Sequence, residues 1–182
     1  LRIASTGTVT GTSGDGIDAL NRGNTTDLVI SAVDVSGAAS GILATNNGTG
    51  TTSITASGAI TGGSGAAIAT LAGANGASAA VVLNAGAVVT RTSTGNVITN
   101  DESASTLAVN AGASVVGKIA LGGGTDDVIF NGGDFSGVSA VDGGNGTDSL
   151  TFANGAAAVA GSQVTNIENL AVGSGGDVSF SG

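Results

Sequence analysis

The chain has 182 residues, a formal net charge of −9, and no His, Cys, Pro, Met, Trp or Tyr. The absence of His and Cys excludes Ser-His-Asp triads, thiolate nucleophiles, disulfides and metal sites built on imidazole or thiolate. The only cations are Arg2, Arg22, Arg91 and Lys118. They are too few to neutralise a phosphate backbone or an anionic membrane surface, so no nucleic-acid partner is expected. No apolar run approaches the roughly 18 residues that cross a bilayer as a helix, so the chain itself is not expected to span a membrane.

The 34 glycines are compatible with a low-complexity linker, but the large apolar residues argue against disorder. Val, Ile, Leu and Phe together make up 44 of the 182 residues. This is about 24%, above the roughly 20% below which chains tend to be disordered. A folded domain with a thin core is therefore predicted.

Three columns of apolar residues recur at intervals of 24 to 29 residues. The first column contains Ile17, Ile42 and Ile68, followed by Val97 or Ile98. The second contains Val9, Val35, Ile60, Val89 and Val115. The third contains Ile3, Ile30, Ile54, Leu83 and Val109. Around them apolar residues alternate with Thr, Ser or Ala, which is typical of strands with one buried face, and Gly marks the bends.

Three short strands in a repeat of this length predict an all-β fold, a right-handed parallel β-helix (β-solenoid). It should have about seven coils of roughly 22–29 residues, stacked about 4.8 Å apart. A helical solenoid is excluded because the apolar residues lack a 3.6-residue period and Gly is frequent.

The repeat changes near Gly122. After this point Asp126 and Asp148 lie 22 residues apart, as do Phe130 and Phe152. We predict a single β-helix domain over 1–182, with longer Gly-Ile and Val-x-Gly coils in 1–121 and shorter Gly/Asp-rich coils in 122–182. All four Phe follow residue 129, so the second part is expected to have the better filled core and the higher local stability.

The chain resembles the passenger domain of type V autotransporter adhesins, most closely over Val138 to Gly182. There the runs VDGGNGTDSLTF (141–152) and VTNIENL (164–170), with Gly173-Ser174, are similar to the segment that such passengers carry ahead of their C-terminal barrel. The first 120 residues resemble the coils of alphaproteobacterial members. The resemblance implies secretion through the outer membrane and display on, or release from, the cell surface. The chain departs from the family in lacking the membrane barrel.

Residues 143–151 match the calcium-binding nonapeptide Gly-Gly-x-Gly-x-Asp-x-apolar-x. Asp126 and Asp148 are therefore candidate calcium ligands. Calcium needs six or more oxygens pooled from successive turns, and the neighbouring partial copy has Leu121 where the first Gly belongs. We favour a turn-forming role without a cofactor, with calcium as the alternative.

Asp126, Asp127, Asp142 and Asp148 are also candidate hydrolytic carboxylates, since inverting glycosidases use two such groups about 6.5–9.5 Å apart. A sugar-binding groove normally offers aromatic platforms and cationic clamps, and the chain has no Tyr or Trp. We therefore predict no catalytic residues and no enzymatic activity. If the carboxylates do line one extended groove, the prediction fails.

Several polar residues recur at regular offsets. Asn21 and Asn46 can stack as a ladder, which is expected to be short because the next coils have Ala72 and Asp101 at this position. We favour a turn-capping role for them, with self-association as the alternative. Rows such as Thr8-Thr10-Thr12 and Thr51-Thr52-Ser53 are each most simply interpreted as the ordinary polar exterior of a β-helix. Together they can also form a flat, weakly charged wall that hydrogen-bonds along another such wall. We interpret Arg22, Arg91 and Lys118 as scattered solubility charges.

The favoured function is that of a non-enzymatic, extracellular or cell-surface β-helix that acts through its lateral faces. It would mediate adhesion, self-association, or contact with a receptor on a host or neighbouring cell. The alternative is a structural subunit of an extracellular filament that stacks end to end, because Ile3 already occupies an apolar column and the pattern still reads as a strand at 177–181.

Overall fold

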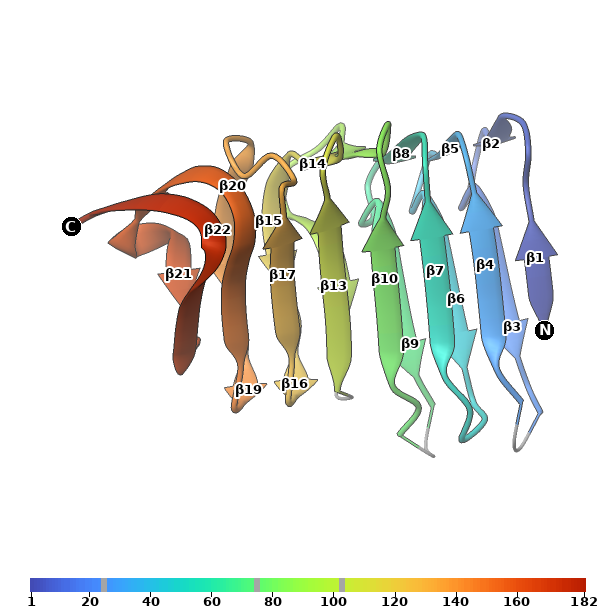
Figure 1. Ribbon diagram of the computed structural model, residues 1–182. Helices are drawn as coiled ribbons and strands as arrows, with labels where there is room; N and C mark the ends of the chain where they lie inside the picture. Colours follow the sequence, from blue (N-terminus) through green and yellow to red (C-terminus); the bar gives the residue numbers. More distant parts are fainter. Residues whose placement is uncertain (24–25, 74–75, 102–103) are drawn as a thin grey trace.

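Parallel strands from successive coils stack along one axis and form the walls of a β-solenoid (Figure 1). This arrangement is seen in a computed structural model, which describes residues 1–23, 26–73, 76–101 and 104–182. The predicted all-β solenoid of about seven coils is confirmed, since one wall contains eight strands and another seven. In the described residues the helical structure is a single 3-10 turn, η1 (Gly161–Gln163).

Three sheets make the walls, and we name them A, B and C. Sheet A contains β1 (Arg2–Ala4), β4 (Leu28–Ala32), β7 (Thr52–Ala56), β10 (Ala79–Leu83), β13 (Ser105–Asn110), β17 (Asp127–Asn131), β20 (Ser149–Ala160) and β22 (Asn169–Ser181). Sheet B contains β2 (Val9–Gly11), β5 (Val35–Gly37), β8 (Ala59–Gly62), β11 (Val88–Arg91) and β14 (Ser114–Val115). Sheet C contains β3 (Ile17–Asn21), β6 (Ile42–Asn46), β9 (Ile68–Ala72), β12 (Asn96–Asn100), β15 (Gly117–Ala120), β18 (Val138–Asp142) and β21 (Val164–Thr165). A small fourth sheet pairs β16 (Gly123–Gly124) with β19 (Asn145–Gly146).

The path of the chain is right-handed, as predicted. In Figure 1 the strands of sheet A run upward on the near side and those of sheet C run downward on the far side. The short strands of sheet B cross between them at the top, and successive coils advance from right to left. This is the hand that twisted parallel strands with crossover connections adopt.

The strand registers confirm two of the predicted apolar columns. Val9, Val35, Ile60, Val89 and Val115 are partners across sheet B. Ile17, Ile42 and Ile68 are partners across sheet C, and the column continues through Ile98 rather than Val97. In-register stacking therefore places like side chains over like in both sheets.

The third predicted column is wrong beyond Ile54. Val81 is the partner of Ile54, whereas Leu83 pairs with Ala56. Both Val81 and Leu83 face inward, because residues two apart lie on the same side of a strand. The sequence interval alone therefore does not show which of the two is the partner of Ile54. The length of the chain between β7 and β10 determines it.

Coils shorten after Leu107. The corrected column of sheet A contains Ile3, Ile30, Ile54, Val81, Leu107, Val128, Leu150 and Leu170. Its intervals are 27, 24, 27 and 26 residues and then 21, 22 and 20. Sheet B ends at β14, so the later coils lose the third strand that the repeat predicted. In the last two, β20 and β22 extend to 12 and 13 residues and curve over the top (Figure 1).

A cluster of three Phe fills the core of the shortened coils. Phe130, Phe135 and Phe152 are each 1% exposed. Phe135 meets Phe130 and Phe152 edge-on at ring-centroid distances of 5.0 and 5.1 Å, and Phe130 stacks on Phe152 at 5.7 Å. These rings occupy the volume that Val, Ile and Ala fill in the earlier coils, so the predicted concentration of core volume in this part is present.

Phe130→Ala is expected to reduce the free energy of unfolding by about 3–5 kcal/mol, because it removes buried ring surface and leaves a cavity. Phe180→Ala is the matched control, since Phe180 is 53% exposed, and it should cost well under half as much. Urea unfolding followed by circular dichroism measures both. Equal losses would contradict the assignment of Phe130 to the core.

Candidate functional site

The outward face of sheet A is the largest regular surface of the described chain, and we call it the sheet A wall. It consists of two outward-facing rows that are in register across all eight strands. The first row contains Arg2, Val29, Ser53, Ala80, Thr106, Asp127, Ser149 and Asn169. The second contains Ala4, Ser31, Thr55, Val82, Ala108, Ile129, Thr151 and Ala171.

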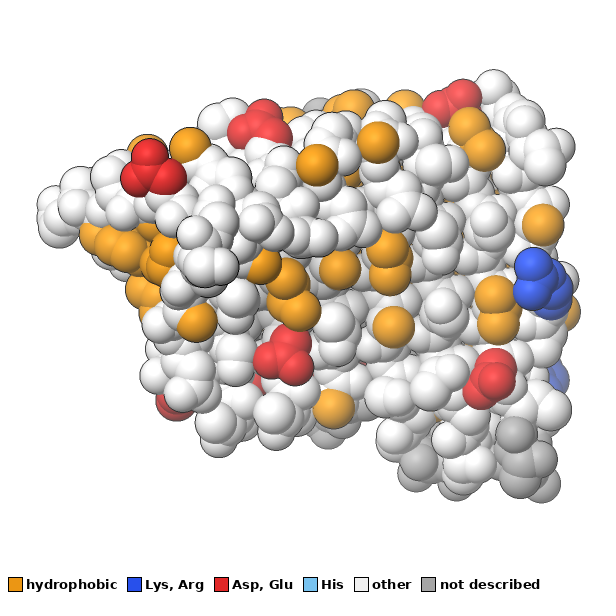
Figure 2. All heavy atoms as spheres, in the orientation of Figure 1, with side chains coloured by type: hydrophobic (Ala, Val, Ile, Leu, Met, Phe, Trp, Pro, Cys, Tyr) orange, Lys and Arg blue, Asp and Glu red, His pale blue; other side chains and the backbone are white. Residues whose placement is uncertain are grey.

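Small neutral side chains dominate this wall. Of its sixteen residues only Arg2 and Asp127 are charged. Figure 2 views this face, and hydrophobic side chains lie along it between uncharged polar ones, with basic atoms at the β1 end. A face with only one long charged side chain can approach another surface at little cost in side-chain entropy or desolvation.

The predicted Ser/Thr rows are partly confirmed and partly wrong. On the outer side of sheet B, Thr10 pairs in register with Ser36, which pairs with Thr61. The Ser36 hydroxyl donates to Thr10 Oγ1 at 3.4 Å. Thr52, by contrast, is 3% exposed and faces the core. The error arises because alternation in a strand sends Thr52 inward when Ser53 points outward.

Asparagine ladders line two corners of the solenoid. Asn21 Nδ2 donates to Asn46 Oδ1 at 2.8 Å, and both side chains are buried. This predicted ladder ends where Asn46 meets Ala72. A longer one was not predicted: Asn110, Asn131 and Asn154 donate to Asn84, Asn110 and Asn131 at 3.1, 3.2 and 2.6 Å. Its sequence signal is an Asn directly after Leu83, Val109 and Phe130, each of which ends the buried run of its strand.

Two of the predicted solubility charges have structural contacts. Arg91 donates from Nε to Ser93 Oγ at 2.9 Å and from Nη1 to the Asn96 carbonyl at 3.1 Å, and its Nη2 donates to the Ser64 carbonyl. Lys118 forms an ion pair with Asp142 at 2.9 Å on the outside of sheet C. Arg91 therefore ties together turns of neighbouring coils.

The two candidate calcium ligands lie in an inward-facing column of sheet A. Leu28, Thr52, Ala79 and Ser105 occupy the column in earlier coils. Asp126 and Asp148 continue it, and both are 0% exposed. A buried carboxylate is costly unless it is hydrogen-bonded, so the partners of these groups decide what they do.

Each carboxylate of this column accepts a backbone N–H from the preceding coil. Asp126 Oδ1 accepts the Ser105 N–H at 2.6 Å and the Ser105 hydroxyl at 2.7 Å. Asp148 Oδ1 accepts the Asp126 N–H at 2.9 Å, and Glu168 Oε2 accepts the Asp148 N–H at 2.8 Å. The backbone amides at the start of these strands thus donate to a carboxylate of the next coil. The carboxylate takes the place of a backbone carbonyl in the turn of that coil.

The second oxygens, Oδ2 of Asp126 and of Asp148, are buried without a hydrogen-bond partner. Burial raises the pKa of Asp126 to about 6, although its hydrogen bonds from Ser105 oppose this rise and the charges of Asp148 and Asp127 add to it. The carboxyl group of Asp126 is therefore easier to protonate in the folded chain than in the unfolded one.

The turns around these residues stack directly on one another. Gly144 and Gly146 have φ of +91° and +148°, and a Cβ on them would lie 1.9 and 1.6 Å from the carbonyl oxygens of Gly122 and Gly124. The Asn145 N–H already donates to the Gly122 carbonyl at 2.7 Å. Residues outside the uncertain segments contain no group of three or more acidic side chains placed to hold a metal ion.

The four candidate hydrolytic carboxylates do not line one groove. Asp126 and Asp148 face the core, and Asp127 points outward from sheet A. Asp142 lies on the outside of sheet C, where it accepts hydrogen bonds from Lys118 and Asn166 at 2.9 and 2.8 Å. The arrangement that the glycosidase hypothesis requires is absent among these residues.

Comparison with protein-family models, with curated proteins and with solved structures found no match for this chain. No helix in the described segments is long and apolar enough to cross a membrane. The strand pairing by itself establishes the fold as a parallel β-solenoid. The surfaces of this fold are the basis for inferring its function.

The raised pKa of Asp126 predicts a pH-dependent stability. Its protonated form is favoured by folding, so its contribution is full below the unfolded pKa near 3.8 and is lost as pH rises through about 6. We expect a loss of roughly 2–3 kcal/mol of unfolding free energy between pH 4 and pH 7 from this group. Asp126→Asn should remove most of this slope and Asp127→Asn should retain it, measured by urea unfolding across this range. Parallel slopes for wild type and Asp126→Asn would contradict the assignment.

Millimolar calcium is expected to leave the thermal unfolding midpoint where an equal concentration of magnesium leaves it, if Asp126 and Asp148 serve only to accept hydrogen bonds from the neighbouring coil. Differential scanning calorimetry with each ion, and with chelator, is the measurement. A calcium-specific rise in Tm that disappears in Asp148→Asn would reverse this conclusion and restore the metal hypothesis.

Proposed function

We propose that this chain is a non-enzymatic, extracellular β-helix of the autotransporter-passenger type, and that it mediates adhesion through the sheet A wall. The observation that carries the proposal is the wall itself, a regular face eight strands long with only two charged residues among its sixteen outward-facing ones. The parallel β-solenoid architecture and the run at 141–152 support membership of this class. Self-association between copies is the form of adhesion that such a face favours, because two similar flat, neutral surfaces can approach along their whole length.

The size of the wall indicates a weak contact between individual molecules. Eight strands about 4.8 Å apart and about five residues long span roughly 34 by 17 Å. Two such faces bury about 1,100 Å² in total, close to the lower limit of roughly 1,000 Å² for a specific interface. A weak contact becomes effective when many copies are displayed together, which is the situation on a cell surface.

Thr55→Lys is expected to reduce self-association several-fold, because it places an ammonium group in the middle of the wall. Thr45→Lys is the matched control, since Thr45 points outward from β6 in sheet C at a similar level of the solenoid. Aggregation of beads that carry the chain at high density, measured by light scattering, compares the variants. If wild-type beads remain dispersed, or if both variants behave alike, the wall is not the adhesive surface.

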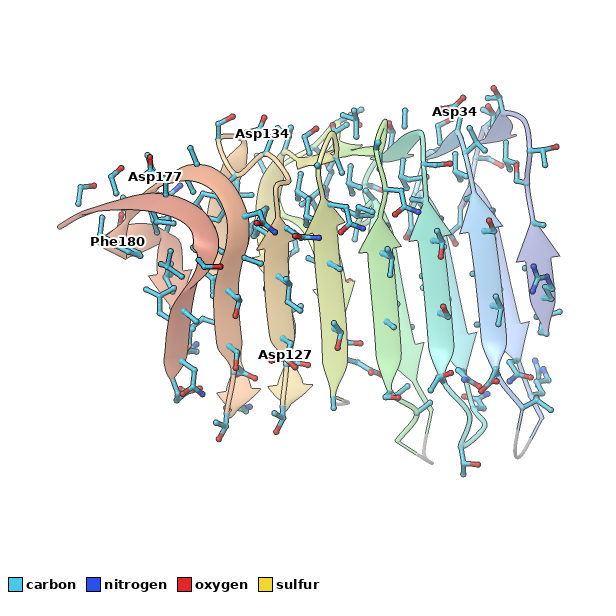
Figure 3. The ribbon with its side chains drawn as sticks, viewed as in Figure 1. Asp34, Asp127, Asp134, Asp177 and Phe180 are labelled. Carbon is cyan, nitrogen blue, oxygen red and sulfur yellow. The ribbon has the colours of Figure 1, made fainter. Side chains whose placement is uncertain are left out.

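The filament alternative rests on a different surface. On β22 the side chains of Leu170, Val172 and Phe180 are 47%, 47% and 53% exposed, and Figure 3 shows Phe180 near the end of this strand. Assembly through this end would be blocked by Phe180→Glu and would tolerate Thr55→Lys. Assembly through the wall has the opposite sensitivity, so the same two variants separate the hypotheses.

A further inference from the structure

The two charges of the sheet A wall have opposite sign and lie in the same row. Arg2 is on β1 and Asp127 is on β17, the first and sixth strands of the sheet. Both side chains are exposed. Figure 3 shows Asp127 on the near face, low on its strand. In register, the neutral residues Val29, Ser53, Ala80 and Thr106 separate the two charges.

We propose that the wall binds a second copy of this chain as a symmetric pair, related by a two-fold axis parallel to the strands, in which each Arg2 faces the partner's Asp127. This inference rests on the proposed function, since it specifies the partner and the register of the same wall. The operation keeps the strand direction and reverses the order of the strands. It therefore places β1 opposite the partner's β17, β4 opposite the partner's β13, and β7 opposite the partner's β10. β20 and β22 lie outside this contact, so the pair uses six of the eight strands and buries about 800 Å² in total, less than the full wall would.

The row structure makes this arrangement self-complementary. Because the axis runs along the strands, the first row of one copy faces the first row of the other, and two Arg–Asp contacts form at once. In the second row, Ala4 faces the partner's Ile129 and Ser31 faces the partner's Ala108. At the centre of the pair, Thr55 faces the partner's Val82. These are small or apolar contacts of the kind found between packed sheets about 10 Å apart.

A further acidic residue, Asp27, lies at the edge of this face within the proposed contact. Asp27 directly precedes β4 and accepts hydrogen bonds from the Thr51 N–H at 2.8 Å and the Thr51 hydroxyl at 3.2 Å. In the proposed pair it lies opposite the partner's Ala104, which is neutral.

Charge also disfavours the other face-to-face arrangement. A two-fold axis along the solenoid would place β1 over the partner's β1 and β17 over the partner's β17. Like charges would then lie near each other at both ends, which selects against that register. An exposed ion pair changes affinity by only about 1.4- to fivefold. The two pairs therefore determine orientation more than strength.

Charge reversal tests the register. Arg2→Glu and Asp127→Arg should each weaken self-association of the full chain by about five- to thirtyfold at low salt, since each creates two like-charged contacts. The double variant Arg2→Glu/Asp127→Arg should return to within about twofold of wild type, because the signs are exchanged and the geometry is kept. Sedimentation equilibrium at low and at physiological salt measures the dissociation constants, and circular dichroism verifies that each variant is folded.

The control set uses charges outside the wall. Asp18 is exposed on sheet C and Arg22 directly follows β3. Asp18→Arg and Arg22→Glu, alone and combined, should leave the dissociation constant of the pair unchanged. Should any single wall variant prove unfolded, Asp127→Asn replaces it, with an expected loss of about two- to fivefold.

The outcomes separate this inference from the proposed function. A wild-type chain that stays monomeric at every accessible concentration overturns both. Self-association that Thr55→Lys weakens, but that the double charge reversal does not restore, overturns the two-fold register and leaves the wall as the adhesive surface. If the double variant recovers the wild-type dissociation constant and the control variants leave it unchanged, the two-fold pair is established.

Discussion

In-register stacking of parallel strands is the constraint on which the rest of this structure depends. Every coil hydrogen-bonds to the next, so each side chain has a fixed neighbour above and below it. Like residues then accumulate into columns, apolar inside and small or polar outside. The columns through Ile17 and Val9 show this in sheets C and B. A side chain that differs in character from the rest of its column therefore has to find its hydrogen-bond and packing partners in its own coil or in the two adjacent coils.

The acidic column shows how such a departure is accommodated. At the position where earlier coils place Leu28 or Ala79, the later coils place Asp126 and Asp148 in the core. Shortening the coil by several residues requires a tight Gly-rich turn, and the carboxylates accept the amides that this turn leaves without a carbonyl. The arrangement leaves one oxygen of each group buried and unpaired. The loss of sheet B in the same coils is compensated by the Phe cluster, which concentrates core volume there.

In-register stacking also determines which side chains can repeat on the outer surfaces. Since every outward position repeats along the axis, one charged residue type per coil would build a charged ladder. The sheet A wall instead repeats small neutral residues, and it has two isolated charges. Such a wall presents few charged groups that would have to be desolvated on contact. These properties favour extended, low-affinity contacts, which gain strength from the number of displayed molecules rather than from deep pockets.

The sequence alone determined the class of fold and much of its register. Apolar residues at intervals near 25, Gly at the bends and the absence of a helical period leave a β-solenoid as the consistent architecture, and the 22-residue spacing of Phe130 and Phe152 is reproduced in the strand pairing. Only the tertiary structure decided which residues are neighbours where the spacing is ambiguous. Val81 rather than Leu83 follows Ile54, Thr52 faces the core, and the Asn that follows Leu83, Val109 and Phe130 joins its neighbours in a hydrogen-bonded ladder. The physical reason is that a strand repeats every two residues, so a turn one or two residues longer changes the partner or the face while leaving the apolar pattern intact.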